Sequence, residues 1–197
     1  MNKKILLVGI SGKIGSGKDT VANVLYDRCG SAVVIRRFAA PLKAVITALT
    51  GLPANTQEDK LTFVPEFDTT VGNLLQVIGT ELFREHFDED VWVKALLANA
   101  KAVGAGVLVI PDVRFENEFE AIRTHGGILI RVEGDPAKVR ENSKRDLNHI
   151  SETALDDVYN WDYKFHNTGT LDELKEKLQP VIDRVDKFII NLAQNKK

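Results

Sequence analysis

The sequence is poor in the residues and patterns that mark secreted, zinc-stabilised or membrane-spanning proteins. It has one cysteine, Cys29, and four scattered histidines, so it offers neither an internal disulfide nor a structural zinc spacing. The first apolar run, at 5–10, meets a glycine-rich stretch too early to complete a signal peptide or a membrane span. Lys and Arg total 26 against 28 for Asp and Glu, so no overall basic field favours a nucleic-acid partner. We therefore expect a cytoplasmic protein that binds neither nucleic acid nor membrane.

Short apolar runs alternate with helical patterns along the 197 residues. A hydrophobic content of 44% with 27% charged residues is ordinary for a folded domain with a core of its own. The runs are short and partly β-branched, as in strands buried on both faces. Such alternation predicts an α/β fold with a parallel sheet. The predicted strands are Ile5–Ile10, Ala32–Ile35, Val107–Ile110, Ile128–Val132 and Tyr163–Phe165.

About 70 residues separate the second predicted strand from the third, which indicates an insertion. It contains amphipathic patterns from Leu42 to Leu49, from Val71 to Leu82 and from Val91 to Val103, and a polar, irregular stretch at 53–68. We expect a small helical subdomain at 41–103 that covers the carboxyl edge of the sheet. A second excursion, at 136–157, is a candidate lid. The core would then comprise 1–40, 104–135 and 158–197.

A glycine-rich loop follows the first predicted strand directly and precedes an amphipathic helix. Its pattern is G-x-x-x-x-G-K, and the strand–loop–helix setting makes it specific for phosphate binding. The glycines let consecutive N–H groups point at phosphate oxygens, the helix start adds positive charge, and Lys18 reaches the β/γ oxygens. We expect this loop to bind a nucleoside triphosphate through Gly12, Lys13, Ile14, Gly15, Ser16, Gly17, Lys18, Asp19 and Thr20.

Asp19 stands where this motif normally has Ser or Thr, and Thr20 follows it. Asp19 is a candidate magnesium ligand, directly or through water, or Thr20 supplies the hydroxyl to a phosphate. An acid in the first helical turn that only favours the helix dipole is an equal alternative.

The third strand runs into Asp112 and Arg114. An acid at the carboxyl end of a buried strand beside the loop strand is placed to organise magnesium or to position the acceptor. Arg114 would hold an acceptor phosphate through a bidentate pair. The alternative for Arg114 is a surface arginine paired with Glu116 or Glu118.

Further basic and aromatic residues occur between the loop and Asp112. Arg37, Lys43 and Arg84 favour a second anion site in this part of the chain, although a solvated position is the commoner fate of any one of them. Phe38 and Trp92 could offer a face for a base, with a core position as the alternative for both.

Several strings together resemble the deoxynucleoside monophosphate kinase family, best known from phages and large DNA viruses. The strings are GKIGSGKDT, FAAPLK, LLQVIGTELFREHFDEDVWV, IPDVRFENE and HISE, and they span most of the chain. The resemblance implies a single P-loop nucleoside monophosphate kinase domain with three layers and a five-stranded parallel sheet of order 2-3-1-4-5, in which 41–103 binds the acceptor. It implies transfer of the γ-phosphoryl group of ATP, with Mg²⁺, to a deoxynucleoside monophosphate for deoxynucleotide supply.

The resemblance also implies roles for particular residues. Lys18, Asp112, Arg114 and the lid arginines Arg140 and Arg145 would act at the transferring group, while Asn167 and Gly169 would border the adenine. Asp19 and Asp112 remain the candidate magnesium residues, directly or through water, and the resemblance leaves the role of Asp19 open. His149, Ser151 and Glu152 match a family string of unassigned role. The acceptor would contact Arg37, Phe38, Lys43, Gln76, Thr80, Glu81, Arg84, Trp92, Arg114 and Glu118.

Other functions stay open at this point. Animal-type phosphomevalonate kinases show a similar Gly-Lys-Asp loop and Asp-x-Arg strand end, and dephospho-coenzyme A kinase is a more distant option. A module that binds ATP without transferring phosphate is the alternative outside the enzymes. The accepted bases, the sugar preference and the oligomeric state, with a homodimer as one option, are not fixed by the sequence.

Overall fold

The computed structural model describes residues 5–103, 106–134 and 150–194. The chain divides into two compact units, one formed by 1–36 with 100–197 and the other by 37–99. The second unit overlaps most of the residues of the insertion predicted at 41–103. Each unit is described by itself. In the described ranges, no helix has both the length and the apolar character needed to cross a bilayer.

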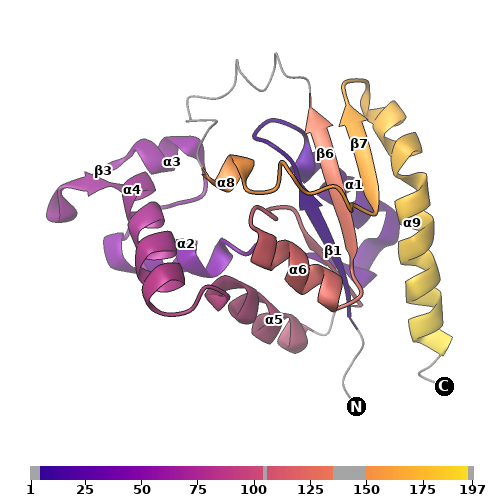
Figure 1. The fold of residues 1–197 in the computed structure, drawn as a ribbon, viewed down its shortest axis with the longest axis horizontal. Coiled ribbons are helices and arrows are strands. Elements are labelled where there is room, and N and C mark those ends of the chain that lie inside the picture. The colour runs from indigo at the N-terminus through magenta and orange to yellow at the C-terminus, as the bar shows by residue number, and fades with distance from the viewer. Residues whose placement is uncertain (1–4, 104–105, 135–149, 195–197) are drawn as a thin grey trace. The chain divides into compact units, whose positions relative to one another are not determined.

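The first unit is built on a five-stranded parallel sheet (Figure 1). Its strands lie in the order β2 (Val33–Ile35), β5 (Val107–Ile110), β1 (Leu6–Ser11), β6 (Ile128–Gly134) and β7 (Tyr163–Asn167). Val8 at the centre of the sheet pairs with Val109 on one side and Ile128 on the other. The predicted order 2-3-1-4-5, counted along these five strands, is confirmed. The loop strand β1 is therefore flanked by the strand that leads to Asp112.

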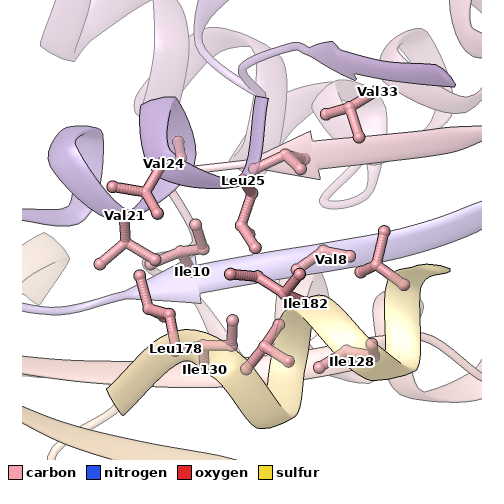
Figure 2. Close-up of a cluster of buried hydrophobic side chains, with 14 of the residues drawn as sticks. Val8, Ile10, Val21, Val24, Leu25, Val33, Ile128, Ile130, Leu178 and Ile182 are labelled. Atoms are coloured by element: carbon pink, nitrogen blue, oxygen red, sulfur yellow. The ribbon is translucent and has the colours of Figure 1, made fainter. Parts of the chain in front are cut away.

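Helices cover both faces of this sheet, because its strands are apolar on both faces. α1 (Lys18–Cys29) and α9 (Leu171–Gln194) pack on one face, where Val8 and Ile10 of β1 meet Leu25 and Ile182 (Figure 2). α6 (Glu116–Thr124) packs on the other face, and its Ile122 approaches Gly9 and is fully buried. The predicted three-layer α/β architecture is confirmed. Two short elements, η1 (Gly30–Ala32) and α8 (Ile150–Thr153), complete the described part of this unit.

The second unit has a small core of its own, formed by Ile46, Ala54, Val64 and Val71. The expectation of an irregular stretch at 53–68 is wrong. Thr56 and Asp59 form a capping box that starts a short helix, and a two-stranded antiparallel hairpin follows. Elements of two to five residues are too short to show a hydrophobic period. The elements are α2 (Ala40–Thr50), α3 (Gln57–Leu61), β3 (Phe63–Val64), η2 (Pro65–Phe67), β4 (Thr69–Thr70), α4 (Val71–Gln76), η3 (Val77–Glu85) and α5 (Val91–Val103), which ends beyond this unit.

The segment predicted as one amphipathic helix from Val71 to Leu82 changes its winding midway. α4 is an α-helix, whereas η3 is a nine-residue π-helix. A π-helix closes its bonds at i→i+5, so residues beyond Gln76 do not continue the 3.6-residue stripe. Leu82, expected on the buried face, is 54% exposed. π-Helical turns are rare in proteins, but those that occur often lie at functional sites. This one contains the predicted acceptor residues Thr80, Glu81 and Arg84.

Candidate functional site: a phosphate-binding loop and a braced arginine

The loop between β1 and α1 is shaped by close backbone approaches that only glycine permits. Gly17 precedes α1 with φ 95°, and a Cβ there would lie 2.2 Å from Nδ2 of Asn167. A Cβ on Gly12 would lie 2.2 Å from the carbonyl oxygen of Val132. Within the described residues, Gly17 makes no side-chain cap at the start of α1. This is the geometry of an anion-binding helix start.

Asn167 holds the loop from the end of β7. Its Nδ2 donates to the carbonyl oxygen of Ser16 at 3.0 Å. The Ser16 hydroxyl is buried and has no hydrogen-bond partner in the part of the chain that the structure describes. A buried hydroxyl without a protein partner is suited to a ligand oxygen, such as one of a polyphosphate, which would satisfy it. Gly169, the other predicted adenine neighbour, lies beside Glu173, whose carboxylate accepts the N–H of Thr170.

Lys18 is a buried cation inside the loop. Lys18 is 8% exposed, and its Nζ donates to the carbonyl oxygen of Lys13 at 2.7 Å. Burial, with a smaller repulsion from Arg114, lowers the pKa of the Lys18 ammonium to about 8. A phosphate would add counter-charge beside this buried ammonium. The role of Lys18 at the phosphates stays a prediction.

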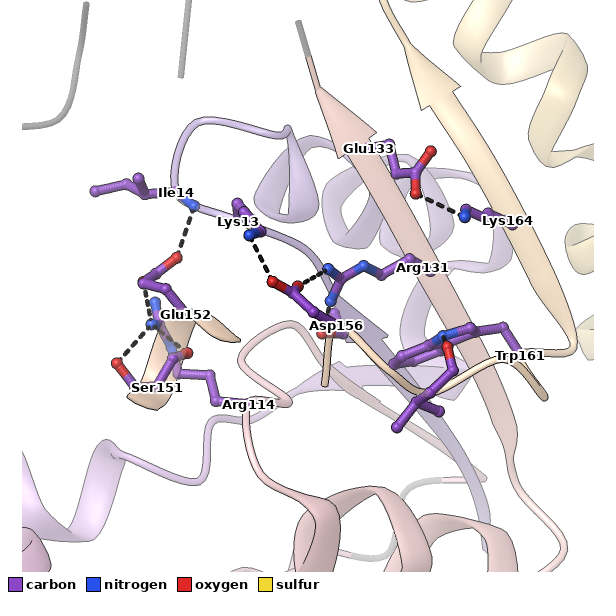
Figure 3. Close-up of polar contacts among 12 residues, drawn as sticks. Lys13, Ile14, Arg114, Arg131, Glu133, Ser151, Glu152, Asp156, Trp161 and Lys164 are labelled. Carbon is purple, nitrogen blue, oxygen red and sulfur yellow. Dashed lines mark hydrogen bonds and ion pairs between the residues drawn. The ribbon is translucent and has the colours of Figure 1, made fainter. Parts of the chain in front are cut away.

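Arg114 is held at both its main chain and its side chain, and Figure 3 shows the contacts of the side chain. Its N–H donates to Oε2 of Glu118 at 2.8 Å, and Glu118 also accepts the N–H of Phe115 at 3.2 Å. Its guanidinium forms an ion pair with Glu152 through Nη1. The alternative of a surface arginine paired with Glu116 or Glu118 through its side chain is not what the structure shows. Glu118 is buried and shapes the turn after β5, and its predicted contact with the acceptor stays a prediction.

Glu152, which the sequence marked only through the HISE string, connects Arg114 to the loop. Its Oε2 accepts the N–H of Ile14 at 3.1 Å, while its Oε1 pairs with Arg114. Burial by itself would raise the pKa of the Glu152 carboxyl, but Arg114, the Ile14 amide and Lys18 together hold that pKa below its ordinary value. Glu152 is therefore an ionised, buried carboxylate between two predicted phosphate-binding groups.

A second acid of the same segment, Asp156, holds the other side of the loop. It pairs with Lys13 at 2.7 Å and with Arg131 at 2.9 Å, and Arg131 also donates to the hydroxyl of Ser11 at 3.2 Å (Figure 3). Our sequence analysis did not single out Arg131 or Asp156. The signal for Arg131 was a charged residue within the otherwise apolar strand run of β6. Together Arg131 and Asp156 connect β6, the loop and the segment after α8.

The two predicted magnesium residues, Asp19 and Asp112, come from different segments of the first unit. Asp19 is exposed in the first turn of α1, and Asp112 is half-buried directly after β5. Among the described residues no group of three or more His, Cys, Asp or Glu side chains could hold a metal. Mg²⁺ often takes only one or two carboxylates together with substrate phosphates and water, so two acids are a sufficient donor set.

The other predicted acceptor residues belong to the second unit. Lys43 lies in the first turns of α2, with its Nζ 3.5 Å from the carbonyl oxygen of Asn55. Phe38 is buried, and Trp92 is buried with its Nε1 donating to the Gly79 oxygen at 3.0 Å. Trp92 also packs against Phe83 with ring centroids 5.3 Å apart, as its core alternative requires. The start of α2 and the residues just before it contribute Arg37, Phe38 and Lys43. The continuous helix formed by α4 and η3 contains Gln76, Thr80, Glu81 and Arg84.

Three predicted residues, Arg140, Arg145 and His149, and most of the candidate lid at 136–157 lie outside the described residues. The predicted roles of both arginines as lid residues stay predictions. The described end of that segment, from Ile150 to Asp156, carries the two acids that contact the loop.

Comparison with known proteins relates this chain to a family. A model of the deoxynucleotide monophosphate kinase family matches residues 53–178. A protein of Acanthamoeba polyphaga mimivirus, named as a candidate deoxynucleotide monophosphate kinase, is 31% identical over 206 residues, covering 93% of this chain and 100% of the viral protein. The deoxynucleotide monophosphate kinase of Enterobacteria phage T4 is 31% identical over 113 residues, 56% of this chain and 44% of the phage protein.

More distant similarities extend along the chain. The deoxynucleoside-5'-monophosphate kinase of Escherichia phage T5 is 26% identical over 220 residues, 78% of this chain and 86% of its own. Among solved structures, shikimate kinase from Acinetobacter baumannii in complex with shikimate aligns with a TM-score of 0.49 and 16% identity, covering 91% of this chain and 94% of that one. The family match and the full-length viral relative establish that this chain belongs to the deoxynucleotide monophosphate kinase family.

Proposed function

We propose that the chain transfers the γ-phosphoryl group of ATP to deoxynucleoside monophosphates, giving the diphosphates, with Mg²⁺. Family membership supports the acceptor class. The observation that carries the proposal is that two features occur in one unit. One is the glycine-rich loop with the buried Lys18, and the other is Arg114, whose side chain is held by Glu152. Phosphoryl transfer depends on positive groups at the phosphates of both substrates, and Lys18 and Arg114 would supply one at each.

The chain's own residues would act by position and charge. Phosphoryl transfer needs two anions brought into line and their charge neutralised as it spreads over the transferring oxygens. The loop amides and Lys18 would bind the triphosphate, and Arg114 would bind the acceptor phosphate. Asp19 and Asp112 would hold Mg²⁺, which supplies charge neutralisation between the phosphates when bound. No strong base is needed, because an acceptor phosphate oxygen is already ionised near neutral pH.

The resemblance to the family supplies the remaining proposed contacts. Arg37, Lys43 and Arg84 would contact the monophosphate, and Arg140 and Arg145 would act on the transferring group as lid residues. The acceptor would be a small molecule of the deoxynucleotide pool, which places the proposed activity in the cytoplasm of the cell or infected host.

An ADP-release assay with ATP, Mg²⁺ and a panel of deoxynucleoside monophosphates tests the proposal. We expect acceptor-dependent ADP release with at least one of them, and none with phosphomevalonate or dephospho-coenzyme A in the same panel. ATP binding without acceptor-dependent release would contradict the proposal and favour a non-catalytic binding module. The variant Lys18→Ala, which removes a preorganised cation, should lose about 3–5 kcal/mol of transition-state stabilisation.

Arg114→Ala separates the two substrate sites. We expect the KM for the monophosphate to rise much more than the KM for ATP, because the guanidinium would contact only the acceptor. An equal loss for both substrates would contradict the assignment of Arg114.

A further inference from the structure

Glu152 is a buried charge that the proposed function does not use. Its side chain is 2% exposed, and it lies on the four-residue helix α8. Burying an ionised carboxylate is costly unless it is paired and hydrogen-bonded. Glu152 meets that condition by accepting from two groups that come from different elements, the Ile14 amide of the loop and the Arg114 guanidinium after β5.

The contact with Glu152 involves only the Nη1 nitrogen of the Arg114 guanidinium. Nη1 donates to Glu152, and it also approaches the carbonyl oxygen of Ser151 at 3.3 Å and its hydroxyl at 3.5 Å. Nε and Nη2 have no partner among the residues that the structure describes. These two nitrogens form the side-on edge of a guanidinium, which matches two oxygens of one phosphate. The Arg114 side chain as a whole is 27% exposed.

The main chain of Arg114 is fixed separately by Glu118, through the N–H bond described above. A guanidinium at the end of a long side chain would still sample many rotamers, and it loses much conformational entropy when a ligand orders it. Glu152 removes that freedom before a substrate arrives. It does so from a point that is itself bonded to the phosphate-binding loop.

We propose that Glu152 is a positioning residue for phosphoryl transfer: it directs the Nε–Nη2 edge of Arg114 toward the acceptor phosphate and fixes that edge relative to the loop. The inference rests on the proposed function, in which Arg114 binds the acceptor. Glu152 touches neither substrate and acts through Arg114. As a negative charge beside two anion sites, it would oppose simple anion binding, so its contribution is orientation and not attraction.

The alternative is that Glu152 only anchors the segment after the candidate lid to the rest of the unit. Asp156 already ties the same segment to the loop through Lys13 and to β6 through Arg131. Among the residues that the structure describes, Asp156 contacts neither Arg114 nor a loop amide. It therefore provides a matched control: an acid on the same segment, next to the same loop, without the bridging geometry.

The test is a double-mutant cycle on acceptor kinetics with the full chain. The variants are Glu152→Gln, Arg114→Gln, the double variant and Asp156→Asn, each with kcat and both KM values measured. We expect Glu152→Gln to lower kcat/KM for the monophosphate at least tenfold while the KM for ATP changes less than threefold. In the Arg114→Gln protein the same substitution should change the residual kcat/KM less than twofold, because its target is gone. Asp156→Asn should leave the KM for the monophosphate within twofold.

Some results would overturn the inference. Equal losses for ATP and monophosphate in Glu152→Gln, or losses that multiply in the double variant, would show a general structural role. If Glu152→Gln is unfolded at the assay temperature by circular dichroism, Glu152→Asp replaces it, since the shorter carboxylate cannot reach Ile14 and Arg114 together, and the same pattern is expected. Failure of the wild-type chain to phosphorylate any monophosphate would instead refute the proposed function, and this inference with it. Normal wild-type turnover with an unaffected Glu152→Gln refutes the inference alone.

Discussion

Replacing Lys18 with methionine should make the protein more stable while removing its proposed activity. The structure buries this ammonium at 8% exposure. Its pKa is lowered, mainly by burial, from 10.5 to about 8. A lowered lysine pKa means that the folded state binds the proton less well than the unfolded state does, so the charged lysine destabilises the fold near neutral pH.

The size of the effect follows from that shift. The difference between 10.5 and about 8 corresponds to about 3 kcal/mol at pH 7. Methionine is similar in size and as good a helix former, so it fills the space without the charge. The lost hydrogen bond to the Lys13 oxygen costs about 1 kcal/mol, and that oxygen keeps the N–H of Ser16 at 3.1 Å. The expected net gain for Lys18→Met is about 2 kcal/mol at pH 7.

The gain must depend on pH in a definite direction. Between about pH 8 and pH 10.5 the unfolded wild type binds more protons than the folded one, so its stability rises with pH. The advantage of Lys18→Met should therefore shrink to about zero near pH 10. Urea unfolding followed by far-UV circular dichroism at pH 7 and pH 10 measures it, with the exposed Lys175→Met on α9 as control. A variant that is less stable than wild type at pH 7, or a difference that does not change with pH, would refute the reasoning.

Four further outcomes follow from the same contacts. Gly17→Ala should destabilise the protein by about 1–2 kcal/mol in urea unfolding, because it strains a left-handed residue and displaces Asn167, and adding Asn167→Ala should recover the steric part only. Cys29, whose pKa is raised by burial and by Asp186 to about 11, should react with iodoacetamide at pH 8 about tenfold more slowly in the native protein than in urea; equal rates would contradict this. Glu118→Ala should cost about 2–4 kcal/mol in urea unfolding, since it leaves two part-buried N–H groups without their acceptor. The pKa of Glu152 is lower in the folded than in the unfolded protein, so its ionised carboxylate stabilises the fold above pH 4.5, and this contribution is lost as the pH falls through the pKa of the folded state. The difference in unfolding free energy between wild type and Glu152→Gln should therefore narrow below pH 4.5.

The sheet and the loop were predictable because their signals are local and repeated. Each buried strand shows as a short apolar run, and the glycines of the loop are required by positive φ and close approach at fixed positions. The order of the strands came from the resemblance, and the pairing of β1 with β5 and β6 confirms it. The winding of η3 was not predictable, because residues 77–82 continue an α-helical period that the π-helix does not follow.

The connections within the site were beyond sequence reasoning for a different reason. Glu152 lies 138 residues from Ile14 and 38 from Arg114, and Asp156 lies 143 from Lys13. Such ion pairs depend on where the chain returns after the lid and on which acid then faces a cation. A family string could mark Glu152 as notable, but only the fold shows that its two oxygens serve two different elements.

The two tryptophans are distributed one to each compact unit. Trp161 stacks edge-on against Phe119 at 4.8 Å and lies near the Arg131 guanidinium, while Trp92 donates to η3 through Gly79. Their intrinsic emission can thus be assigned without any introduced label: a Trp92→Phe protein reports from the sheet and its charged segment, and a Trp161→Phe protein reports from the helical insertion. Titrating each single-emitter protein with one substrate at a time would show which half of the molecule senses the nucleotide donor and which senses the acceptor.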